Sequence, residues 1–255
     1  MDSRANARIA AATGVLFVAA LAAAGLISEI KEFDRAGDLA LGASNEVFGT
    51  VTLLTGFAAG FFFWFTSTLA ARIRELEAGS GRLAAAVNGS GAIIAGLLSL
   101  LVGVSFAARS AGSAELAALA TAIANGPTLF FPAAVFLAAG STVTLRTPTV
   151  PPYSMWLARL ILPLAFAYGA GAGLMLFKNY AWINETGFIS FLVVILLTSI
   201  IGIQRWGAMD LAAPRGPSRS VAAASTPTPA VPVAEAPVRK AKPKPRARKG
   251  APRKR

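Results

Sequence analysis

Apolar residues along the chain gather into six long runs instead of alternating with polar ones. The runs occupy residues 9–27, 51–71, 91–108, 116–140, 156–177 and 187–203. About 20 apolar residues in a helix cross the bilayer core, which is about 30 Å thick. Because lipid offers no hydrogen-bond partners, each run must satisfy its own backbone and is expected to be helical. The pattern predicts an all-α membrane protein with six transmembrane helices.

Charged side chains are almost absent from these runs. The exception is Arg159, which lies one turn inside the fifth run. Charged residues make up 14% of the whole chain, against about 25% in ordinary soluble domains. Proton-coupled pumps and voltage sensors usually depend on ionisable groups inside the membrane. The pattern therefore argues against an ion-coupled transporter.

The first run has some features of a secretory signal peptide. Arg4 and Arg8 precede it, and small residues occupy positions 22–25 near its end. Its 19 residues, 9–27, exceed the apolar core of about 7–15 residues that signal peptides carry. We therefore expect a retained first span, while cleavage would leave five spans.

The distribution of Lys and Arg predicts the orientation. With residues 1–8 in the cytoplasm, the inner segments up to residue 210 hold eight basic residues and the outer loops hold four. Acidic residues show the opposite bias, with seven in the outer loops and four in the inner segments. Because basic loops stay cytoplasmic, both termini are predicted to be cytoplasmic.

The composition changes after the last run. Residues 207–237 are rich in Pro, Ala, Ser and Thr and show no hydrophobic periodicity, so we expect a disordered linker. Residues 238–255 form a polybasic tail without aromatic or acidic side chains. Its basic residues are Arg239, Lys240, Lys242, Lys244, Arg246, Arg248, Lys249, Arg253, Lys254 and Arg255.

This tail predicts a class of binding partner. Clustered Lys and Arg neutralise phosphates regardless of sequence, and without aromatics the tail has no stacking platform for bases. A tail tethered beside a membrane is expected to bind anionic lipid headgroups, or nucleic acid nonspecifically. The leading hypothesis is a membrane-anchored interaction protein, and the alternative is a charge run that only orients or solubilises the chain.

The fourth run is interrupted by Asn125, Gly126 and Pro127. Pro127 removes a helix hydrogen bond. Many transporters build a substrate site from such a broken helix, which makes a small-solute permease or transporter subunit the second hypothesis. A kink satisfied by neighbouring helices is the alternative, and the sequence favours it.

Enzymatic chemistry has little support in the composition. The chain has no histidine and no cysteine, which removes the commonest general base and the usual transition-metal ligands. The long outer loop, residues 28–49, is expected to hold a short surface helix. Its acids Glu32, Asp34 and Asp38 could attract a divalent cation, although a solvated acidic loop is favoured. We expect no catalytic residue, cofactor or metal site.

Small and aromatic residues suggest further contacts. Small residues four apart permit close helix approach, here expected to serve packing within the chain first and a homo-oligomer second. The pairs are Gly56 and Gly60, Ala92 and Gly96, and Gly169 and Gly173. Aromatics near the run ends should form interfacial belts; they are Trp156, Tyr180, Trp182 and Trp206.

Three stretches carry a family resemblance. They are ARIAAATGVLFVAALAAAGLIS, LAARIRELEAGSGRLA and PPYSMWLARLILPLAFA. With them, residues 6–206 resemble multi-pass membrane proteins of unassigned activity that are common in actinobacteria. The tail resembles the Lys/Ala/Pro-rich tails of bacterial histone-like proteins. The resemblance implies a bacterial plasma membrane, and it transfers no functional residue.

Overall fold

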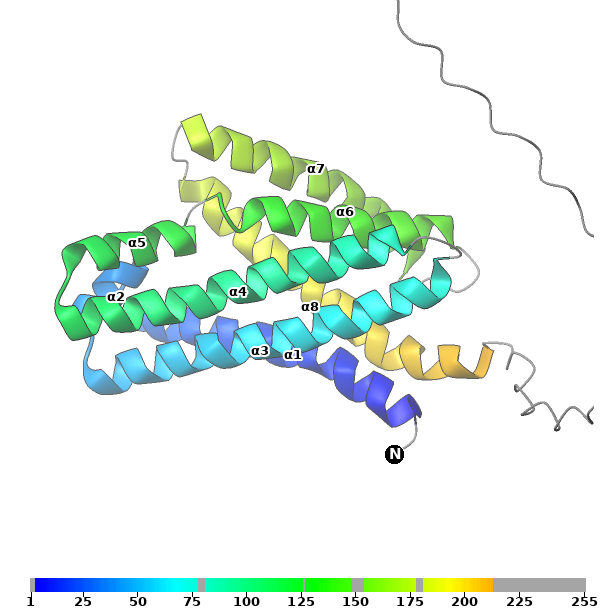
Figure 1. Cartoon of the computed structure of the whole chain (residues 1–255), viewed down its shortest axis with the longest axis horizontal. Coiled ribbons are helices and arrows are strands. Elements are labelled where there is room, and N and C mark those ends of the chain that lie inside the picture. Colours follow the sequence, from blue (N-terminus) through cyan, green and yellow to red (C-terminus); the bar gives the residue numbers. More distant parts are fainter. Residues whose placement is uncertain (1–2, 78–80, 126, 148–153, 178–180, 213–255) are drawn as a thin grey trace, which may run out of the picture. The chain divides into compact units, whose positions relative to one another are not determined.

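The structure, a computed structural model, describes residues 3–77, 81–125, 127–147, 154–177 and 181–212. Within these ranges the chain forms eight helices and no strand (Figure 1). The prediction of an all-α protein is confirmed for this part of the chain. The basic tail, most of the predicted linker, Gly126 and Tyr180 lie outside the described residues.

Six spans are long and apolar enough to cross a membrane within the described ranges, which confirms the predicted number. The fourth span, Ala114–Arg146, consists of two helices, α5 and α6. In chain order the helices are α1 (Ser3–Ile30), α2 (Ala36–Gly42), α3 (Asn45–Leu76), α4 (Arg82–Ala111), α5 (Ala114–Asn125), α6 (Phe130–Arg146), α7 (Met155–Phe177) and α8 (Ala181–Ala212).

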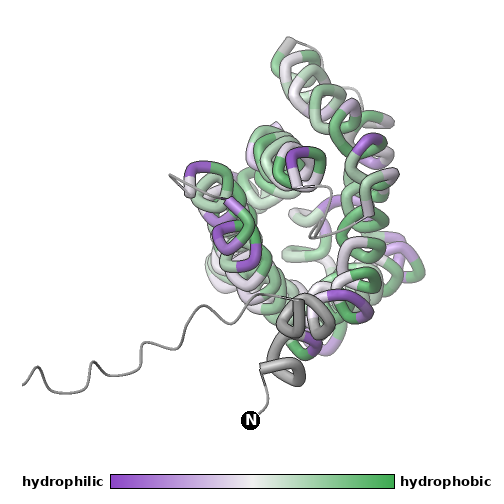
Figure 2. Tube along the Cα trace, turned by 90° about the vertical axis from the view of Figure 1, so that its right-hand side faces the viewer, coloured by the Kyte–Doolittle hydropathy of each residue, from purple (hydrophilic) through white to green (hydrophobic). Residues whose placement is uncertain are grey.

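The helices pack against consecutive helices and against helices further along the chain. α1 packs against both α3 and α8, and α4 packs against α3, α5 and α6. The short helices α2 and α5 lie together at one end of the bundle (Figure 1). Hydrophilic positions form only short patches on the helices (Figure 2). Large apolar side chains such as Trp64, Leu160 and Phe166 point outward, as contact with lipid requires.

Local hydrogen bonds fix the helix ends on both sides of the bundle. The Glu77 carboxylate accepts the N–H groups of Leu83 and Ala84 at 3.1 and 3.2 Å, so it satisfies two of the N–H groups that the start of α4 leaves unpaired. At the other end of α4, Gly112 adopts φ 60°. A glycine in this left-handed conformation ends a helix without steric cost, and the chain turns directly into α5.

The glycines that allow close helix approach are not the predicted ones. A Cβ on Gly14 of α1 would lie 2.0 Å from Ser199 Oγ of α8, and one on Gly91 would lie 2.5 Å from Thr66 Cβ. The prediction that the paired glycines pack against other helices of the chain is wrong for five of them, because a Cβ on each would meet nothing within 4 Å. They are Gly56, Gly60, Gly96, Gly169 and Gly173. These residues face open space. The homo-oligomer remains a prediction.

Trp206 is buried and does not belong to an interfacial belt. Its indole stacks on Phe65, with 6.1 Å between ring centroids. α8 continues to Ala212, beyond the apolar run, so residue 206 still lies inside the bundle. Trp156 and Trp182 are exposed, and their position at the edge of the membrane stays a prediction.

Candidate functional site

The fourth span is broken where the sequence predicted an interruption. α5 ends at Asn125 and α6 begins at Phe130, whose N–H donates to the Pro127 carbonyl at 3.0 Å. Pro132 lies in the first turn of α6, where a missing N–H costs no helix hydrogen bond. The two prolines therefore separate one apolar run into two helices joined by a turn.

A pocket of about 310 Å³ opens beside this break, and we call it the α2 pocket. Asn125 and Leu129 contribute the wall at the break, and Phe188 contributes the start of α8. Further walls come from α1, α3 and α4, and the segment from Phe33 to Leu39 covers the pocket. The break thus opens onto a space shared by most of the bundle.

Neutral polar groups line the sides of the α2 pocket. They are Ser28, Thr52, Thr55, Ser105 and Asn125. The Thr55 hydroxyl donates to the Val51 carbonyl at 2.8 Å, so its lone pairs remain able to accept. Ser105 is only 7% exposed, and its hydroxyl has no hydrogen-bond partner among the described residues. A ligand hydroxyl or amide could therefore bind at Ser105.

Charged side chains occur only at the exposed rim of this pocket. Asp34, Arg35 and Glu185 are exposed lining residues. Of the predicted acidic cluster, Asp34 lines the pocket, but Glu32 and Asp38 do not. The described residues contain no group of three or more side chains suited to hold a metal ion. The rim can orient a charged or polar end of a solute, and the interior cannot neutralise a full charge.

A smaller cavity of about 40 Å³ lies next to the α2 pocket, and we call it the aromatic chamber. The two cavities share Leu21, Leu98, Ala124, Leu129 and Phe188 as lining residues. The chamber adds the rings Phe17, Phe130, Tyr168 and Phe191. The shared walls indicate that the chamber continues the pocket toward the aromatic core.

The polar atoms of the chamber are paired within its wall. The Tyr168 hydroxyl donates to the Gly187 carbonyl and lies 2.8 Å from Ser190 Oγ. Gly187 is needed at this position because a Cβ there would lie 2.5 Å from Cε1 of Phe130. Tyr168 therefore presents its ring to the chamber while its hydroxyl joins α7 to α8.

Helix α2 forms a roof that is attached on two sides. The Gly37 N–H donates to Thr121 Oγ1 of α5 at 2.9 Å. Arg109 of α4 donates to the carbonyls of Ala40 and Ala43 at 3.1 and 2.9 Å. The loop was expected to hold a short surface helix, and α2 is that helix. However, its Gly37, Leu39 and Ala40 are buried, so it is a packed roof and not a solvated loop element.

Polar residues of the spans do not gather at one place in the structure. Asn125 lines the α2 pocket, Pro127 forms the adjoining turn, and Ser190 pairs with Tyr168 at the chamber. Ser199 lies elsewhere, against α1. Sequence reasoning missed Thr55 and Ser105, because isolated hydroxyls in apolar runs give no signal about which cavity they face.

Comparisons with known proteins add no assignment. No known protein family, characterised protein or solved structure matches the chain. Function therefore has to be inferred from the pocket, the spans and the distribution of charge.

Proposed function

We propose that this protein is a plasma-membrane permease or transporter subunit that binds a small amphipathic solute in the α2 pocket. One observation carries the proposal: the broken fourth span places Asn125 in the wall of a pocket lined by several spans. Broken helices at such pockets are a recurring way to expose backbone polar groups to a solute. Mostly apolar walls with a few polar groups are typical of small-molecule sites.

The lining supports a solute with an uncharged polar part and an apolar part. Hydroxyls of Thr55 and Ser105 offer hydrogen bonds, and the aromatic chamber offers a dry apolar surface. A full charge in the interior would lack a counter-charge and would be costly to desolvate. Charge on the solute is therefore best placed near Asp34, Arg35 and Glu185 at the rim.

Passage beyond the chamber requires a conformational change. Phe62 is fully buried and packs at 4.6 Å from Phe17 and 5.8 Å from Phe191, measured between ring centroids. Phe17 and Phe191 line the chamber, and their packing on Phe62 closes the core beside it. Alternating-access transporters open one side at a time by moving helices around a central site, and the break in the fourth span supplies a hinge for such a motion.

The direction in which the pocket opens follows from the loop charges. Basic residues prefer the cytoplasmic side, and Arg74, Arg82 and Arg146 lie near helix ends away from α2. This supports cytoplasmic termini and an α2 pocket that opens to the outside of a bacterial cell.

Replacing Ser105 with leucine tests the proposal. The isobutyl group would enter the α2 pocket and remove the hydroxyl, so we expect uptake of a solute by reconstituted liposomes to fall about tenfold, the equivalent of about 1.4 kcal/mol of lost binding. The solute would be chosen from a panel of neutral amphipathic compounds by its stabilisation of the wild-type protein. Ser99→Leu is the matched control, since Ser99 is exposed on the same helix and should leave uptake unchanged. Transport loses its support if wild type moves no compound, or if both variants lose uptake equally.

The charge distribution favours a second function, binding of anionic partners by the tail. Residues 211–255 carry a net charge of +11, while residues 1–210 carry +1. Ten basic residues in positions 239–255 support nonspecific contact with lipid headgroups or nucleic acid. In this second function the spans anchor the tail at the membrane.

Deletion of residues 238–255 should abolish binding of the solubilised protein to phosphatidylglycerol vesicles and to duplex DNA. Binding of the full chain should weaken steeply with salt. For duplex DNA, each neutralised phosphate steepens the fall of log K with log salt concentration by about 0.9. Competition between vesicles and DNA would rank the two partners. Binding that persists after the deletion would show that the tail is not the binding element, whereas solute uptake should be unaffected either way.

A further inference from the structure

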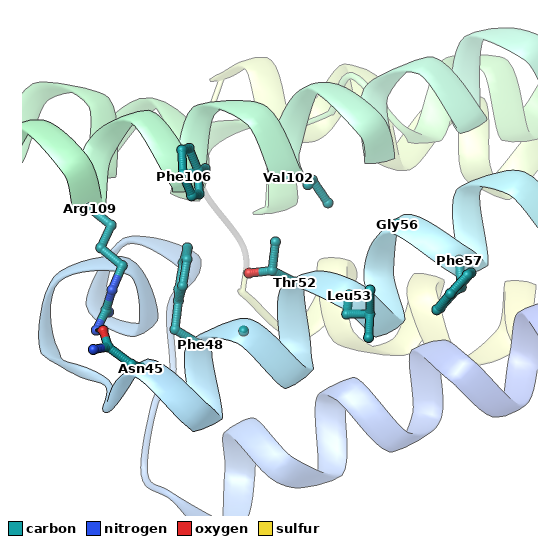
Figure 3. Close-up of a pocket in the computed structure, with 10 residues that line it drawn as sticks. Asn45, Phe48, Thr52, Leu53, Gly56, Phe57, Val102, Phe106 and Arg109 are labelled. Carbon is teal, nitrogen blue, oxygen red and sulfur yellow. Dashed lines mark hydrogen bonds between the residues drawn. The ribbon is translucent and has the colours of Figure 1, made fainter.

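A second hollow lies on the exterior of the bundle between α3 and α4, and we call it the α3–α4 groove. Its volume is about 660 Å³, and Thr52 and Val102 line both the groove and the α2 pocket. Figure 3 shows side chains of α3 and α4 facing each other across the groove, with Asn45 and Arg109 at one end. The rest of its lining is apolar apart from Thr52. The groove is thus an apolar channel with one polar end.

The close approach of α3 and α4 at Thr66 and Gly91 lies away from their α2 ends. There, a Cβ on Gly91 would lie 2.5 Å from Thr66 Cβ. Toward the α2 end, Gly49 and Gly56 leave gaps between the larger side chains of the α3 wall, and a Cβ on either would meet nothing within 4 Å. This open wall lies on a membrane-spanning helix and has the shape and polarity to take a hydrocarbon chain.

Arg109 places a positive charge at the polar end of the groove. Arg109 donates to Asn45 Oδ1 at 2.7 Å and to the carbonyls of Ala40 and Ala43, all of which are neutral acceptors. Its guanidinium also lies 4.6 Å from the centroid of the Phe48 ring. No carboxylate pairs with Arg109 among the described residues. A guanidinium has five N–H donors, so donors remain for an anion.

We propose that the α3–α4 groove binds a membrane phospholipid, with an acyl chain along Gly49 and Gly56 and the headgroup phosphate at Arg109. Guanidinium and phosphate form strong charge-assisted hydrogen bonds, and the apolar wall receives the chain. A phospholipid satisfies both ends of the groove, whereas a second copy of the α3 face offers no anion. The bound phosphate would also hold Arg109, and through it the α2 roof, in place.

Native mass spectrometry of the full chain tests this proposal with two probes that share their acyl chains. Dioleoyl phosphatidylglycerol should remain bound, and dioleoylglycerol, which lacks the phosphate, should not. Arg109→Gln should reduce bound phosphatidylglycerol about tenfold, as expected for loss of one charge-assisted contact of about 1.5 kcal/mol. Because Arg109 also holds α2, the second variant is Gly56→Leu, which fills the groove and leaves Arg109 intact; it should lower binding equally.

Gly60→Leu is the matched control. Gly60 lies one turn further along α3, is equally open, and does not line the groove, so this variant should bind phosphatidylglycerol like wild type. Equal retention of both probes by wild type would overturn the proposal, because the phosphate would not be recognised. A change from dimer to monomer with both Gly56→Leu and Gly60→Leu would overturn it in favour of an interface between copies of the chain.

Discussion

Replacing Gly14 with leucine is expected to destabilise the bundle by about 3 kcal/mol, at the upper end of the usual cost of overpacking a core. A Cβ at this position would already lie 2.0 Å from Ser199 Oγ and 2.8 Å from Phe65 Cδ2. Phe65 is fully buried and stacked on Trp206, so it has no space to move into. The higher helix propensity of leucine recovers less than about 1 kcal/mol.

Thermal unfolding in detergent would measure this effect, with Gly25→Leu as the control. Gly25 lies on the same helix, and a Cβ there would meet nothing within 4 Å. The control should therefore melt at the wild-type temperature or above, while the Gly14 variant melts well below it. If the two variants melted alike, α1 and α8 would not be in the close contact that the structure describes.

The spans could be predicted from sequence because a bilayer imposes a simple rule on each one. Length and polarity decide whether a helix can cross, and no knowledge of its neighbours is required. The break in the fourth span was also predictable, since Pro127 removes a hydrogen bond wherever the other helices lie. These features depend on local chemistry alone.

Features that depend on the neighbouring helix could not be predicted. Gly14 and Gly56 look alike in sequence, yet Gly14 touches α8 and Gly56 faces open space. Trp206 resembled an interfacial residue until the full length of α8 placed it against Phe65. Which face of a helix meets a partner is set by the packing of the whole bundle.

The site was predicted only in part, for the same reason. Asn125 was selected because Pro127 follows it closely, and it lines the α2 pocket. Ser105 has no such local marker, and its role depends on where α4 lies relative to α1 and the break. The roof required two long-range pairings, Arg109 with Ala43 and Gly37 with Thr121, and neither has a sequence signature.

A cysteine at position 105 is expected to react readily with a water-soluble thiol reagent. The chain has no cysteine of its own, so each single-cysteine variant carries one reactive thiol. Ser105→Cys is nearly isosteric and places the thiol in the wall of the α2 pocket. A thiol needs water to ionise and react, and the pocket supplies it at the α2 end of the bundle.

Gly103→Cys provides the contrast on the opposite face of α4. Gly103 is exposed on the outside of the bundle, and a Cβ there would meet nothing within 4 Å. In a membrane this face meets lipid, where the thiol stays protonated and beyond the reach of a charged reagent. Its reaction should be far slower than that of the cysteine at position 105, although the two positions lie only two residues apart.

The most direct test of a water-filled binding pocket beside the broken span is this pair of variants in membrane vesicles, treated with a membrane-impermeant methanethiosulfonate. We predict rapid labelling of Ser105→Cys from the side on which α2 lies, and none of Gly103→Cys. Protection of both positions, or equal labelling of both, would contradict it.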